Sequence, residues 1–176
     1  MNKRAWIILI ILHAALLLSV YALQGMIFPY VRILGLIPLL LPIVSTGIAV
    51  YEGCHAGGIA GLFAGILCDV SFNQPIGTFT VTLTLTGLFI GALFDSVLMR
   101  GFVTYMISCF AVLVLSVFVQ ITTLLLLTET VPSHNAVFTL AFRQTFFSFA
   151  FALPLWFFVR ALGRRMQDIS SRERPL

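Results

Sequence analysis

Two aspartates and one arginine are charged side chains within or at the ends of long apolar segments. Asp69 and Asp95 each follow glycines spaced four residues apart, and Arg143 lies about two helical turns inside the last apolar segment. Inside a membrane such groups can relay protons, contact a ligand or form an ion pair. The two aspartates are expected near opposite faces of the membrane, too far apart for a catalytic dyad. A structural role is therefore favoured over proton transport.

Catalysis has no recognisable basis in the sequence. The chain contains no Gly-x-Ser-x-Gly, no His-Glu-x-x-His and no phosphate-binding Gly-Lys-Ser/Thr. Cys54 beside His55 lacks a second pair of ligands at a suitable spacing, so no metal site is expected. We therefore expect a protein that is not an enzyme and that uses no cofactor.

Small residues form one stripe along each of two consecutive apolar segments. Where side chains are small, two helix backbones approach closely, and in lipid this packing is a main source of helix association. Packing of the two stripes on each other is favoured, and use of the groove by a partner's helix is the alternative. The stripes consist of Gly57, Gly61, Gly65 and Asp69, and of Thr80, Thr84, Gly87, Gly91 and Asp95.

The elements that carry these residues are expected to be membrane-spanning helices. Of the 176 residues, 60% are hydrophobic and 9% charged, whereas soluble domains have about 25% charged residues. Apolar runs of about 20 residues, enough to cross a hydrocarbon core of about 30 Å, fill nearly the whole chain. The predicted fold class is an all-α integral membrane protein of one domain. Its six helices are expected over residues 5–23, 33–50, 54–70, 78–99, 102–127 and 136–162, followed by a basic tail over 163–176.

Two of these segments carry conflicting local signals. Threonine alternates with other residues over 78–86, which by itself predicts a strand. A lone strand in lipid would leave its backbone groups unpaired, so we expect a helix whose threonine hydroxyls bond to the preceding turn. In segment 33–50, Pro38 is expected in the first turn and Pro42 deeper, where it would bend the helix.

The first segment resembles a signal peptide in its basic start, but its apolar run is longer than an ordinary signal sequence. An uncleaved helix is favoured, which gives six crossings and places both termini on one side. Basic residues in short loops and ends stay in the cytoplasm, so both termini are expected there. On that side lie Lys3, Arg4, Arg100, Arg160, Arg164, Arg165, Arg172 and Arg174, whereas Arg32 lies opposite.

This topology places Asp69 and Arg143 in the same half of the bilayer. Each charge needs compensation there. The rival partner, Arg32, lies at a helix end, where its side chain can reach the polar interface by snorkelling. The sequence therefore predicts an ion pair between Asp69 and Arg143 that ties the third helix to the sixth.

The first stripe contains Gly61, Gly65 and Asp69 at spacings of four and leads into a short polar loop, 71–77, that ends in Pro-Ile-Gly. This pattern resembles the central signature of the MreD family, the rod shape-determining proteins of bacterial cell-wall elongation. Pro38 followed by three leucines also fits that family's layout. The detailed resemblance covers residues 38–77, and the helix count and termini agree with it.

The resemblance implies a non-enzymatic scaffold in the bacterial cytoplasmic membrane. Its expected partners are membrane lipid, the bitopic protein MreC, and a peptidoglycan glycosyltransferase and transpeptidase. No nucleic acid and no small-molecule substrate are expected. The alternative is the substrate-binding subunit of an energy-coupling-factor vitamin transporter, since those subunits share six helices and a related glycine-rich hairpin.

Overall fold

The described part of this computed structural model is helical, apart from short connections. It covers residues 3–26, 38–72, 75, 77–96, 101–127, 139 and 142–157. By length and composition, α3, α4 and the segment Phe102–Thr123 of α5 are each able to cross a membrane. The helices are α1 (Lys3–Met26), α2 (Leu40–Glu52), α3 (Cys54–Ser71), α4 (Thr78–Ser96), α5 (Phe102–Leu127) and a sixth helix over 142–157.

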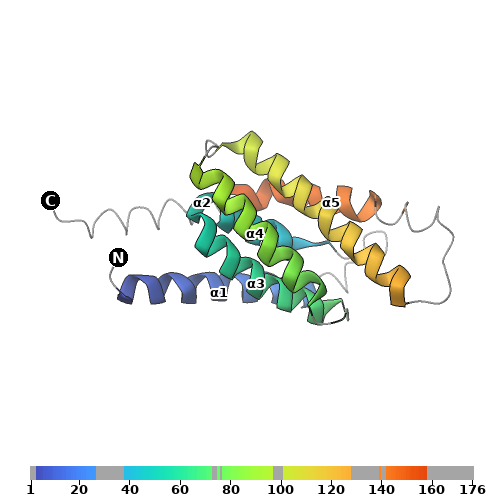
Figure 1. The fold of residues 1–176 in the computed structure, drawn as a ribbon, viewed down its shortest axis with the longest axis horizontal. Coiled ribbons are helices and arrows are strands. Elements are labelled where there is room, and N and C mark those ends of the chain that lie inside the picture. The colour runs from blue at the N-terminus through green and yellow to red at the C-terminus, as the bar shows by residue number, and fades with distance from the viewer. Residues whose placement is uncertain are drawn as a thin grey trace.

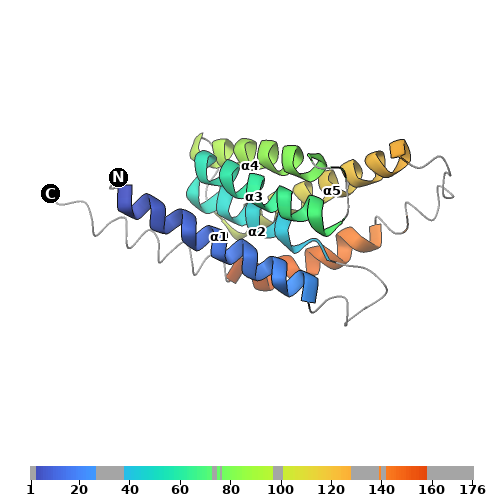
Figure 2. The ribbon, with the colours of Figure 1, turned by 90° about the horizontal axis from the view of Figure 1, so that it is seen from below.

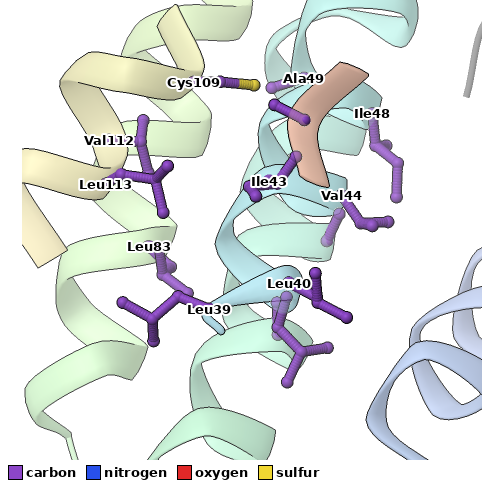
Figure 3. Packing of buried hydrophobic residues seen from close by; sticks show 14 of the residues in the cluster. Leu39, Leu40, Ile43, Val44, Ile48, Ala49, Leu83, Cys109, Val112 and Leu113 are labelled. Carbon is purple, nitrogen blue, oxygen red and sulfur yellow. The ribbon is translucent and has the colours of Figure 1, made fainter. Parts of the chain in front are cut away.

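Helix α2 lies at the centre of the bundle. All of its residues from Leu40 to Val50 are buried, because α1, α3, α4 and α5 all pack against it. Figure 3 shows its side chains facing Leu83 of α4 and Val112 and Leu113 of α5. With 13 residues it is about 20 Å long at 1.5 Å per residue. Helix α2 is therefore shorter than the hydrocarbon core, which is about 30 Å thick.

The start of α2 differs from the prediction. We expected a helix from residue 33 with Pro42 deep inside it, but α2 begins at Leu40, after Pro38. Pro42 is the third residue of the helix, where its missing N–H costs no bond within the helix. The prediction that Pro42 bends the helix was therefore wrong. Residues 33–37 lie outside the described ranges.

Helices α3 and α4 form an antiparallel pair that lies side by side in both views (Figures 1 and 2). The alternating threonines are helical, as the membrane argument predicted. Thr82 and Thr84 donate their hydroxyls to the carbonyl oxygens four residues earlier, at 2.8 and 2.6 Å. These bonds satisfy the hydroxyl groups within the helix. They confirm the prediction that the threonine hydroxyls bond to the preceding turn.

The helix over 142–157 packs on the side of α2 away from α4 (Figure 2). Aromatic rings join it to α5, since Phe102 lies edge-on to Trp156 with ring centroids 4.9 Å apart and Phe110 lies edge-on to Phe149 at 5.7 Å. The fully buried Ser148 accepts a hydrogen bond of 2.9 Å from the N–H of Leu39, just before α2 begins. A side chain from the sixth helix therefore satisfies a backbone donor at the buried start of α2.

Helix α1 lies along one edge of the bundle, against α2 and α3 (Figure 1). Its buried side chains recur at three- and four-residue intervals, so they form one face of the helix. They are His13, Leu16, Leu17, Val20 and Gln24.

Candidate functional site

The glycines of α3 lie directly against the backbone of α4. A Cβ atom added at Gly61 would overlap the carbonyl oxygen of Leu83, and one at Gly65 would overlap the Cα atom of Thr80. A side chain at either position could not be accommodated, whereas glycine lets the two backbones touch. The groove on α3 is therefore filled by α4 of the same chain.

The glycines of α4 make the same contacts in the opposite direction. A Cβ atom at Gly87 would overlap the carbonyl oxygen of Gly57, and one at Gly91 would lie 2.5 Å from the Cα atom of Cys54. The two stripes singled out in the sequence face each other over most of their length. This close approach fixes where the ends of the two helices meet.

At one end of the pair, Asp69 of α3 caps the start of α4. Its Oδ1 accepts a hydrogen bond from the N–H of Phe79 at 2.7 Å, and its Oδ2 accepts bonds from the N–H groups of Gly77 and Thr80 at 2.8 and 3.2 Å. The hydroxyl of Thr80 donates a further bond of 2.6 Å to Oδ2. The first N–H groups of a helix have no partner inside it, and they carry positive partial charge. The side chain of Asp69, whose residue is only 2% exposed, supplies what that helix end lacks.

At the other end, Asp95 of α4 caps the start of α3. Its Oδ2 accepts a hydrogen bond of 2.9 Å from the N–H of Cys54. The preceding residue, Gly53, has no side chain to cap the helix and adopts φ +90°. A Cβ atom there would lie 2.5 Å from Oδ2 of Asp95. Each helix of the pair thus ends in an aspartate that binds the first turn of the other.

The predicted ion pair between Asp69 and Arg143 does not form, so that prediction was wrong. The carboxylate of Asp69 is occupied by the backbone of α4, and Arg143 is exposed on the helix over 142–157. In the part of the chain that the structure describes, the close contact between a carboxylate and a basic side chain is a different one. Backbone donors at a helix start compensate the carboxylate here in place of a basic side chain.

That contact joins His13 of α1 to Glu52 at the end of α2, with 2.7 Å between Nε2 and Oε1. Both side chains are largely buried. Nothing in the sequence around His13 suggests a partner for this histidine. The sequence feature that could have indicated a partner for His13 is Glu52. This acidic residue lies in a connection too short to keep it far from the membrane interior, so it needs a polar partner. The pair links α1 to the turn between α2 and α3.

The other reactive side chains do not gather into a site. Cys68 and Cys109 are free and buried, and Cys54 is partly exposed. Over the described ranges, no three His, Cys, Asp or Glu side chains are placed so that they could hold a metal ion. The recognisable arrangement is therefore the interlocked α3–α4 pair.

Comparison with known proteins identifies the family. A search of curated proteins and a search of solved structures gave no match. The family model described as rod shape-determining protein MreD matches residues 1–166, which is nearly the whole chain. The chain therefore belongs to the MreD family of rod shape-determining proteins.

Proposed function

We propose that this protein is a non-enzymatic scaffold of the cell-wall elongation complex that binds MreC and, with it, the peptidoglycan glycosyltransferase and transpeptidase. A role in determining rod shape follows from membership of the MreD family. We further propose that the chain crosses the bacterial cytoplasmic membrane six times and that both termini lie in the cytoplasm. The basic residues at the two ends of the sequence support this orientation.

One observation carries the scaffold proposal more than any other. Asp69, a buried acidic residue in a membrane helix, has both carboxylate oxygens engaged by the start of α4. A proton relay or a catalytic acid must exchange its proton with a substrate or with water, and hydrogen bonds to fixed backbone amides oppose this. The acidic residue that could most readily have done chemistry is instead used to hold the helices together.

The packing also restricts where partners can bind. The small-residue groove on α3 is occupied by α4, so a partner's helix cannot use that groove without separating the pair. Many large apolar side chains are exposed on the outer faces of the helices. We therefore place the contacts with MreC on those outer faces.

Depletion of the protein from rod-shaped cells tests this function. We expect the cells to become round, and re-expression of the wild-type chain should restore rods. Affinity capture of the tagged protein from native membranes should bring down MreC. Rod-shaped growth after depletion, together with loss of vitamin uptake, would reject the scaffold and favour the transporter subunit instead.

A further inference from the structure

Arg143 differs from the other charged side chains that the structure describes in the membrane helices. Asp69 and Asp95 bind helix starts, and Glu52 contacts His13. Arg143 is exposed, and no ion pair involves it within the described ranges. The carboxylate predicted to compensate it is already occupied. Within the described part of the chain, no carboxylate supplies a counter-charge for Arg143.

The surface around Arg143 is apolar and rich in phenylalanine. Phe142, Phe146, Leu153 and Phe157 are all exposed, and Phe146 reaches 71%. Their spacings of four, seven and four residues place them on one face of the helix over 142–157. We call this surface the Arg143 face. The opposite face of the same helix packs into the bundle through Ser148, Ala152 and Trp156.

A cation on such a face departs from the usual arrangement in membranes. Ionisable residues within membrane helices almost always face protein or a water-filled cavity, where they find partners, and seldom face lipid. Arginine and aromatic side chains, phenylalanine among them, are also enriched in protein interfaces relative to the rest of the protein surface. Both observations favour a protein partner on the Arg143 face over hydrocarbon.

We infer that the Arg143 face binds a transmembrane helix of a partner protein, and that Arg143 pairs with a carboxylate on that helix. The phenylalanines supply the apolar contact, and the guanidinium group fixes the depth and orientation of the incoming helix. This inference rests on the proposed function, because it assigns the docking of bitopic MreC to one face of the protein.

Two other anions could reach Arg143, and each has a distinct consequence. A lipid phosphate could be reached by snorkelling, because helix side chains point towards the N-terminal end of their helix. Lysine would serve that contact as well as arginine does, whereas a two-point bond to a carboxylate requires the planar guanidinium group. Glu129 of the same chain lies outside the described residues and is the intramolecular alternative.

The test places a photo-crosslinking amino acid at Phe146 in the full-length chain, in cells that contain tagged MreC. The matched control carries it at Phe89 of α4, which is 67% exposed on another helix. We expect a crosslink to MreC from position 146 and none from position 89. In parallel, Arg143→Gln and Arg143→Lys should lower the MreC that co-purifies by about thirtyfold, the lower end for an interface hot spot. Glu129→Gln should leave it unchanged.

The possible failures can be told apart. If wild-type protein captures MreC but position 146 gives no crosslink, the inference is overturned and the scaffold function stands. If Arg143→Lys captures as much MreC as wild type while Arg143→Gln does not, a lipid phosphate is the counter-charge and the carboxylate pairing is wrong. If Glu129→Gln reproduces the loss, the partner of Arg143 lies in the same chain. Failure of the wild-type chain to capture MreC would overturn both proposals.

Discussion

Asp69 and Asp95 cap each other's helices. Asp69, near the end of α3, binds the first N–H groups of α4, and Asp95, near the end of α4, binds the first N–H of α3. Each aspartate follows two glycines at spacings of four, so the same local pattern runs in opposite directions along the pair. The glycines bring the backbones together, and the aspartates determine how far one helix can slide along the other.

The two caps should contribute unequally to stability. Asp69 is buried and accepts four hydrogen bonds, whereas Asp95 is exposed to solvent. Asp69→Asn should lower the free energy of unfolding in detergent by about 2 kcal/mol, because the amide can accept at only one of its two positions and leaves buried N–H groups unpaired. Asp95→Asn is the matched control and should cost less. A larger loss for Asp95→Asn would contradict this ranking.

The glycine contacts predict that even one methyl group is too large. Gly61→Ala should destabilise the protein by about 1–3 kcal/mol, since the added Cβ would overlap the Leu83 carbonyl oxygen and force the helices apart. Gly61→Leu should reduce the amount of folded protein further. Gly25→Ala in α1 is the control, because nothing lies within 4 Å of its Cβ position. Thermal unfolding in detergent measures both, and equal behaviour of the two alanine variants would refute close packing at Gly61.

The buried contact between His13 and Glu52 should be detectable as an energetic coupling. A double-mutant cycle with His13→Gln and Glu52→Gln is expected to give a coupling free energy of about 0.6 kcal/mol, with about 1.7 kcal/mol as the upper end for polar pairs between membrane helices. His55 is exposed and serves as the control histidine. Strict additivity of the two substitutions, or an equal coupling of Glu52 with His55→Gln, would show that α1 is not held by this pair.

The proposed orientation predicts a cytoplasmic C-terminus. Alkaline phosphatase fused after Leu176 should be inactive, because the enzyme matures only outside the cytoplasm, where its disulfides form. A fusion of a cytoplasmically active reporter at the same position is the complementary control and should be active. Strong phosphatase activity would contradict the proposed topology of six membrane crossings.

The sequence revealed features that depend on local spacing. Helix α5 has the range expected from its apolar run, Phe102–Leu127. Helix α4 could be told from a strand because lipid leaves an unpaired strand no partner for its backbone groups. The spacing of four in the glycine stripes also specifies a helix face directly. These inferences required no knowledge of which segments are neighbours in space.

The features that sequence reasoning missed depend on contacts between distant residues. The N–H of Leu39, just before α2, donates a hydrogen bond to Ser148, which lies 109 residues further along the chain. Nothing in the sequence near Leu39 indicates this contact. A basic side chain at a similar depth is the partner that the sequence suggests for Asp69, although backbone N–H groups are equally good donors. The sequence feature that indicates this cap is the position of Asp69. It is an acidic residue at the end of one helix, and Gly77, just before the next helix, follows eight residues later. A short loop between antiparallel helices brings these two ends together.

Binding of MreC to this protein is the most direct test of the scaffold account. The measurement titrates purified full-length MreC against the full-length chain with both proteins in the same detergent, so that their transmembrane helices can meet, and with no other component of the elongation complex present. We predict saturable binding that is unaffected by Phe89→Ala and weakened by Phe146→Ala. The absence of saturable binding by the folded wild-type protein would contradict the central claim.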